Sequence, residues 1–267
     1  GFVPMFNGKD LSGWQGLVEN PIARAAMAPD VLAAKQKEAN AKLPLNWTVV
    51  NGEIRFTGTG YENLCSVKDY ADFEMWVDWR ISKNGDSGIY LRGTPQVQIW
   101  DTTRVDVGAN VGSGGLYNNK TNPSKPLKLM DNAINDWNTF FIRMVGEKVT
   151  VYLNGELVVD NVTLENYWDR KLPIFPSGPI ELQAHGTDLA FRDVYVRNLS
   201  SSQISLTPEE ETNGFVSLFN GKDLTGWKAL GPKNQWIAEN GVLKSPASGA
   251  NLCTEQKFND FKLHIEF

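Results

Sequence analysis

Three short segments of the chain place chemically useful side chains at every second residue. They are residues 88–92 (GIYLR), 96–100 (QVQIW) and 180–185 (IELQAH). Side chains alternate between the two faces of a β-strand, so the aliphatic members of each segment can face a core while the others share the opposite face. That opposite face would carry Tyr90, Arg92, Gln96, Gln98, Trp100, Glu181, Gln183 and His185.

These side-chain types are the ones that bind sugars. A guanidinium fork and amide groups hydrogen-bond neighbouring hydroxyl groups, and flat rings stack on the C–H face of a sugar ring. The segment Gly114-Gly115-Leu116-Tyr117 adds one more ring outside these strands. The sequence therefore predicts a carbohydrate-binding face. Its expected substrate-binding residues are Tyr90, Gln98, Trp100, Tyr117 and Gln183.

Each of the ionisable residues also has a purely structural interpretation. The outer face of an antiparallel sheet is ordinarily polar, so Glu181 could be a plain solvated carboxylate. Arg92 could pair with Asp86 or Asp101 only to hold a loop. Asp101, which ends one segment, could cap the following glycine-rich loop or serve the site. His185 could be a hydrogen-bonded structural residue.

The elements that position these residues are predicted to be antiparallel strands. The dipeptides Asn51-Gly52 and Asn154-Gly155 each lie between two apolar runs, which is typical of a β-hairpin with a tight turn. Residues 72–81 alternate apolar and polar side chains, as in a strand with one buried face. Many short strands separated by Gly, Asn and Pro favour an antiparallel sandwich. Within the segment 15–45, helix-forming residues predict one short helix near 29–42, which either covers a sheet edge or shapes a pocket.

The beginning of the chain has a close counterpart near its end. Residues 2–14 read FVPMFNGKDLSGW and residues 215–227 read FVSLFNGKDLTGW. The likeness predicts a complete domain over 1–198, a polar linker over 199–214 and the truncated start of a second copy over 215–267. Half a sandwich would expose apolar surface and strand edges. We therefore expect a second domain that extends beyond Phe267.

Composition narrows the range of partners. The formal net charge is −5, the pI is about 5.2, and charges of both signs are spread along the chain without a basic stripe. This pattern argues against a nucleic-acid partner. The sequence has no apolar run close to the ~20 residues of a membrane span. It begins at Gly1 and contains no signal peptide.

Several motifs together resemble the 3-keto-disaccharide hydrolase family. They are FNGKDLSGW (6–14), GDSGIYLRG (85–93), QVQIWD (96–101), GGLY (114–117), WN (137–138), LNG (153–155) and IELQAHG (180–186). The resemblance covers 1–198, and its opening third recurs at 215–267. It implies an all-β, concanavalin A-like jelly roll with a glycan site on one sheet. It also implies a bacterial protein of the periplasm or outside the cell, acting on sugars oxidised at C3.

The implied reaction begins with the ketone at C3, which acidifies the proton at C2. A base removes that proton, the C1 substituent leaves by β-elimination, and water can add back to give net hydrolysis. Such a site needs a base, an electrophile at the C3 oxygen and an acid at the leaving oxygen. The expected catalytic residues are His185 as base or acid, Arg92 as electrophile, and Asp101 or Glu181 as the orienting group or second acid.

The sequence alone decides neither the cofactor nor the functional class of the protein. No cofactor is evident, although a divalent cation could replace Arg92 as the electrophile, and its ligands cannot be named from spacing. The main alternative is a non-catalytic carbohydrate-binding module that uses the same face without a titrating group. A structural or assembly module is a third alternative, if the inserted helix fills the face.

Overall fold

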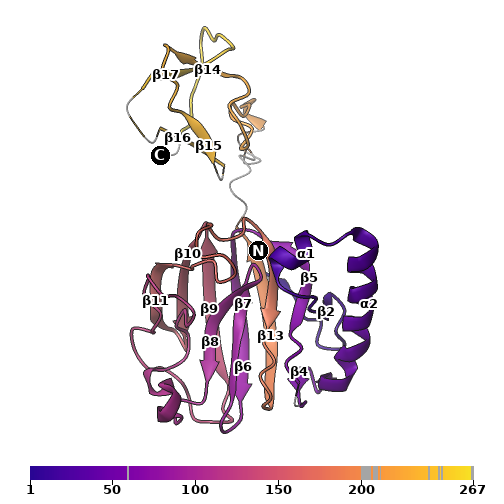
Figure 1. Cartoon of the computed structure of the whole chain (residues 1–267). Coiled ribbons are helices and arrows are strands. Elements are labelled where there is room, and N and C mark those ends of the chain that lie inside the picture. Colours follow the sequence, from indigo (N-terminus) through magenta and orange to yellow (C-terminus); the bar gives the residue numbers. More distant parts are fainter. Residues whose placement is uncertain are drawn as a thin grey trace. The chain divides into compact units, whose positions relative to one another are not determined.

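The computed structural model describes residues 1–58, 60–199, 206, 210, 212–239, 241–245, 247 and 249–265. The chain forms two compact units, Gly1–Leu199 and Ser200–Phe267, each of which is described separately. The first unit is an antiparallel β-sandwich of the jelly-roll type (Figure 1). The predicted all-β fold is thus confirmed.

An eight-stranded sheet forms one layer of the first unit. Its main path runs β11 (Glu156–Thr163), β10 (Lys148–Leu153), β9 (Asn138–Val145), β6 (Phe73–Ile81), β13 (Leu189–Asn198), β4 (Glu53–Phe56) and β3 (Trp47–Val50), and β1 (Val3–Pro4) pairs with β13. Both Asn-Gly dipeptides make tight hairpin turns. Asn51 and Gly52 have φ of 53° and 77°, and Asn154 and Gly155 have φ of 52° and 85°. These left-handed conformations suit Asn and Gly and match the twist of the flanking strands.

A five-stranded sheet forms the other layer. Its strands, in spatial order, are β2 (Trp14–Gly16), β5 (Leu64–Tyr70), β12 (Gly178–Leu182), β7 (Asp86–Leu91) and β8 (Thr94–Trp100). The core lies between the two sheets, where Phe73, Phe140 and Phe191 of one layer meet Ile89 and Leu182 of the other, all with no exposed surface. Each such side chain contributes roughly 1.5–3 kcal/mol by leaving water.

The inserted segment forms two helices rather than one short helix. They are α1 (Pro21–Ala25) and α2 (Pro29–Asn46). A proline at the first turn starts each helix, and the Asn20 side chain accepts a hydrogen bond from the backbone N–H of Ala23 at 2.9 Å. The prediction of helix near 29–42 located α2 but ended before its last turn, and it missed α1 altogether.

Helix α2 covers the edge of the five-stranded sheet at β2 (Figure 1). Gln36 Nε2 donates to the carbonyl of Gly16 at 2.8 Å, and Asn40 Oδ1 accepts from the N–H of Gly16 at 2.9 Å. Position 16 must be glycine, because a Cβ there would lie 2.6 Å from the carbonyl oxygen of Ala39. The outward backbone groups of Gly16 on this edge strand are therefore satisfied by side chains of the insertion.

The second unit contains two small two-stranded sheets. They pair β14 (Trp227–Leu230) with β17 (Asn251–Thr254), and β15 (Ile237–Glu239) with β16 (Val242–Lys244). Its described residues leave Phe261, Leu263 and Ile265 more than half exposed. Unlike Phe73 and Met75 of β6, these side chains have no second strand layer among the described residues of the unit.

Candidate functional site

The outer face of the five-stranded sheet carries a row of polar side chains across four neighbouring strands. Strand register places Gln15 beside Cys65, Cys65 beside Glu181, and Glu181 beside Tyr90. The aliphatic neighbours of these residues face the core, so alternation directs this row to the opposite side. The row lies on the side of the sheet to which α1 contributes Arg24.

Glu181 is the most unusual group in the row. Its side chain is 1% exposed, Asn63 Nδ2 donates to its Oε2 at 3.3 Å, and Arg24 Nη2 lies 4.0 Å from Oε1. Burial raises the pKa of Glu181 to about 7, against the lowering effects of Arg24 and of the hydrogen bond from Asn63. A carboxyl group of this kind can both hold and release a proton near neutral pH.

Tyr90 and Gln183 form the next part of the face. Gln183 Nε2 donates to the phenolic oxygen of Tyr90 at 3.3 Å, while Gln183 Oε1 is buried and accepts no hydrogen bond. Burial, with the nearby Glu181 charge, raises the pKa of Tyr90. The phenol therefore stays protonated and can serve as a hydrogen-bond donor at neutral pH. Both residues belong to the set that the sequence predicts for this face.

His185 continues the alternation beyond β12. It follows Glu181 by four residues and is exposed, whereas Ala184 beside it is buried. The His185 ring makes an edge contact with Tyr61 at 5.4 Å between centroids, and Tyr61 is 68% exposed. The imidazole is thus open to solvent beyond the end of β12.

Arg92 does not lie in this row. It occupies the turn after β7 with φ of 54°, where strand alternation no longer applies. Its Nε donates to the carbonyl of Ala71 at 2.6 Å, Nη1 to the carbonyl of Phe175 at 3.2 Å, and Nη2 to Asp72 at 2.7 Å. The side chain is 3% exposed. The structure therefore shows Arg92 as an anchor between loops, and its salt-bridge partner is Asp72 rather than Asp86 or Asp101.

Asp101 caps the loop that follows β8. Its Oδ1 accepts from the N–H and hydroxyl of Thr103 at 2.9 and 2.7 Å, and its Oδ2 accepts from the N–H of Asn84 at 2.7 Å. Burial would raise the pKa of Asp101, but the hydrogen bonds from Thr103 and Asn84 hold it below its ordinary value. The carboxylate is fully buried and its partners are backbone and hydroxyl donors of the loop. These contacts correspond to the structural alternative for Asp101, in which it caps the glycine-rich loop after β8.

The remaining predicted residues of β8 are mostly bound to the protein. Gln98 Nε2 donates to Asp86 Oδ1 at 2.8 Å and to the carbonyl of Ser87 at 3.1 Å. Trp100 is 6% exposed and its indole N–H donates to the carbonyl of Gly112 at 2.8 Å. Tyr117, 51% exposed, contacts the Trp100 ring edge-on at 5.4 Å, so it is the ring of this pair that a ligand can reach.

Three residues that contribute to this face lie outside the sequence motifs. Asn63, just before β5, and Cys65 on β5 lie on either side of core Leu64, so the alternation of side chains along this segment could have revealed them. Burial raises the pKa of the Cys65 thiol to about 12, and this residue is a free thiol. Arg24 could not have been found, because nothing in the inserted segment indicates which strand its short helix approaches.

Among the residues that the structure describes, no three His, Cys, Asp or Glu side chains lie close enough together to hold a metal ion.

Comparison with known proteins places the chain in a family. The model of the 3-keto-alpha-glucoside-1,2-lyase-like domain matches residues 1–197 and again residues 214–267. The chain belongs to this family. Membership confirms the resemblance carried by the sequence motifs.

Individual relatives are more distant. A curated 3-keto-disaccharide hydrolase of Bacteroides thetaiotaomicron is 26% identical over 98 residues, which span 34% of this chain and 27% of that protein. Two solved structures from Parabacteroides distasonis ATCC 8503, both described as candidate glycosyl hydrolases, are 21% and 19% identical. They cover 74% of this chain and 94% and 100% of their own, with TM-scores of 0.54 and 0.53. These two structures support the fold alone.

Proposed function

We propose that the first unit cleaves the glycosidic bond of 3-keto-glucosides, by removal of the C2 proton and departure of the C1 substituent. The outer face of the five-stranded sheet is the proposed site. The observation that carries this proposal is Glu181, a buried carboxyl group with a pKa of about 7 on the strand that leads to His185. Family membership supports the substrate class.

The spacing of the two ionisable groups suits one sugar ring. His185 follows Glu181 by four positions, beyond the end of β12 at Leu182, so the chain between them spans at most about 14 Å. We propose that one sugar ring lies between the two side chains. His185, which is exposed, is the proposed base at C2. Glu181 is the proposed acid at the leaving oxygen, because a pKa near the working pH favours proton transfer.

Gln183 lies midway between them and is the proposed contact for the oxygen at C3. Its amide meets Tyr90, whose raised pKa keeps the phenol as a donor. These two neutral donors would replace Arg92 in stabilising an enolate oxygen. A substrate reaches Glu181 when Arg24 moves aside. The 4.0 Å separation between these two groups is longer than a hydrogen-bonded ion pair and leaves the contact weak.

The test is release of the aglycone from a chromogenic 3-keto-glucoside. The wild-type protein should turn it over, whereas the matched glucoside with a C3 hydroxyl should remain intact because its C2 proton is not acidic. Binding of both compounds without release would identify a carbohydrate-binding module. Equal cleavage of both compounds would contradict proton abstraction at C2.

Location and domain organisation are part of the same proposal. We place the glycan-active domain at 1–198, in a protein of the periplasm or one that is secreted. The family match over residues 1–197 supports the bounds of this domain. In the part of the chain that the structure describes, no helix is long and apolar enough to pass through a membrane.

A further inference from the structure

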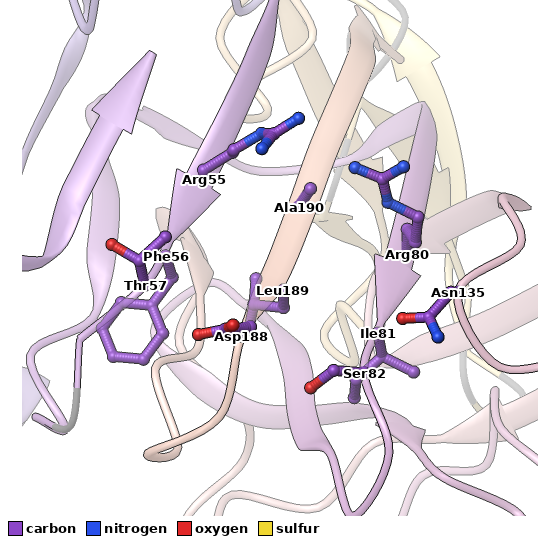
Figure 2. Close-up of a pocket in the computed structure, with 10 residues that line it drawn as sticks. All are labelled: Arg55, Phe56, Thr57, Arg80, Ile81, Ser82, Asn135, Asp188, Leu189 and Ala190. Carbon is purple, nitrogen blue, oxygen red and sulfur yellow. The ribbon is translucent and has the colours of Figure 1, made fainter. Parts of the chain in front are cut away.

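The eight-stranded sheet has a pocket of its own on its outer face. The pocket has a volume of ≈ 230 Å³ and lies over the ends of β4, β13 and β6 (Figure 2). Its floor is Ala190, which pairs with Arg55 on β4 and with Arg80 on β6. Figure 2 shows both guanidinium groups leaning over β13 from either side. A small residue between two arginines thus makes the hollow.

Both arginines are held in place yet keep free donors. Glu53 Oε2 accepts from Arg55 Nε at 2.9 Å and from Arg80 Nη2 at 3.0 Å. The Arg80 guanidinium also lies over the Trp137 ring at 4.7 Å from its centroid. Because one carboxylate oxygen serves both groups, Arg55 Nη1 and two nitrogens of Arg80 remain available. Held in this way, the donors lose little entropy when a ligand binds.

The opposite rim of the pocket offers hydroxyl, amide and carboxylate groups. Thr57, Ser82, Asn135 and Asp188 all line it, and their side chains make no hydrogen bond to any described residue. Backbone hydrogen bonds fix the rim itself, from Ser82 N–H to the carbonyl of Asp188 at 3.2 Å and from Asn135 N–H to the carbonyl of Ile81 at 3.1 Å. The pocket thus has donors on one wall, and on the other it has two hydroxyl groups and an amide that both donate and accept, with one carboxylate that accepts.

We infer that this pocket binds one neutral sugar ring of a glycan, at a second site separate from the face proposed for catalysis. Sugar hydroxyl groups donate and accept at once, which matches the two walls. The charges of Arg55 and Arg80 are balanced by Glu53 and Asp188, and the Asp188 carboxylate would repel an anion. The volume is below the roughly 300–1,000 Å³ of pockets for drug-sized ligands, so it admits one ring.

The same outer face can contact the rest of the glycan. Trp76 lies four residues before Arg80 on β6, about 13 Å away along the strand. It belongs to an aromatic row, formed by Tyr195, Trp76, Phe141 and Tyr152 on four neighbouring strands. Trp76 is 41% exposed and contacts Phe141 at 4.8 Å. Exposed rings suit the apolar face of a second or third sugar.

The experiment titrates the protein with neutral trisaccharides, cellotriose and maltotriose, and with trigalacturonate as the anionic comparison. Carbon-13 labelling of alanine methyl groups reports contact at Ala190. A neutral trisaccharide should shift this signal saturably, and His185→Ala on the other sheet should leave the shift unchanged. This second site does not depend on the proposed activity, since the readout is binding alone.

Three variants test whether the neutral sugar binds in this pocket. Ala190→Leu fills the hollow and should weaken calorimetric binding at least ~10-fold, while Arg143→Gln, on the same sheet face but outside the pocket, should change it less than ~2-fold. Asp188→Asn removes an acceptor and should weaken binding of the neutral sugar by about 3–10-fold. The inference is overturned if no neutral trisaccharide shifts Ala190. It is also overturned if trigalacturonate binds more tightly and Asp188→Asn strengthens it, or if folded Ala190→Leu binds as wild type does.

Discussion

The two outer faces of the sandwich hold their carboxyl groups in different ways. On the eight-stranded sheet, Glu53 lies 2.8 Å from Arg55 and Asp78 lies 3.2 Å from Arg192. On the five-stranded sheet, Glu181 is buried, and its nearest arginine, Arg24, is 4.0 Å away. A buried carboxyl group without a close cationic partner can titrate near neutral pH. We therefore assign proton transfer to the outer face of the five-stranded sheet, and ligand binding without proton transfer to the outer face of the eight-stranded sheet.

The inserted segment produces this difference. Asn20 and Pro21 start α1, whose Arg24 reaches the outer face of the five-stranded sheet, and α2 closes its edge at Gly16. The pocket of the eight-stranded sheet is lined by residues 55–57, 80–82, 135 and 188–190, none of them from the insertion. The insertion covers part of the outer face of the five-stranded sheet and leaves the outer face of the eight-stranded sheet open. Similar residue types therefore have different electrostatic environments on the two faces.

The largest expected difference between the faces is in turnover. We predict that His185→Ala lowers turnover of a 3-keto-glucoside by ~10²–10⁴, because an acid–base group is lost. Arg55→Gln on the opposite face should change turnover less than about 3-fold. Rates of aglycone release are measured on both variants, and circular dichroism checks that both are folded. These rates show whether turnover depends on one face only. Equal losses in both would remove the distinction between the faces.

The second expected effect is on stability and concerns Arg92. Replacing Arg92 by Met leaves Asp72 and two backbone carbonyls without their partner, which should lower the free energy of unfolding by about 3–5 kcal/mol. The exposed Arg143, changed to Met in the same way, should cost about 0.5 kcal/mol or less. Urea denaturation measures both. If fully folded Arg92→Lys protein has lost turnover, Arg92 regains the catalytic role that its motif suggested.

The strands and their faces could be predicted from the sequence, whereas the partners of individual side chains could not. Alternation in Tyr90, Glu181 and Gln183 gave the correct face, because the period of a strand is a local property. Arg92 was misplaced because it lies in a turn, and its partners Asp72 and Phe175 are distant in sequence. The same limit applies to Glu181, whose burial depends on a helix about 160 residues earlier.

The third prediction concerns the pH dependence of stability. The pKa of Glu181 is about 7 in the folded protein, against 4.5 for an ordinary glutamate. Below pH 4.5 both states carry the proton. As the pH rises from there to 7 the unfolded state releases it first, so this group lowers stability by up to ~3 kcal/mol at high pH. Glu181→Gln should therefore gain stability relative to wild type between pH 5 and pH 8. Parallel pH curves for the two proteins would show that Glu181 is ionised throughout.

The smallest expected effect concerns Arg24. Its positive charge lowers the pKa of Glu181, so Arg24→Gln should raise that pKa by up to about 1 unit. Glu181 must be protonated to act as the proposed acid, so the alkaline limb of the pH–rate profile should move in the same direction. Arg104→Gln, which loses the pair with Asp86 at 3.5 Å on the same sheet, serves as the control and should leave the limb in place. A limb that moves equally in both variants would exclude a specific effect of Arg24.

The fate of the C2 proton tests the proposed function most directly. The wild-type protein would cleave a 3-keto-glucoside in D₂O, and proton NMR would follow C2 of the first-formed product. The isolated product and the substrate without protein serve as exchange controls. Proton abstraction predicts that the product has lost the original C2 proton. C2 then carries deuterium if water has added back, and it carries no hydrogen if elimination is the last step. Aglycone release with the C2 proton retained would contradict the proposed reaction.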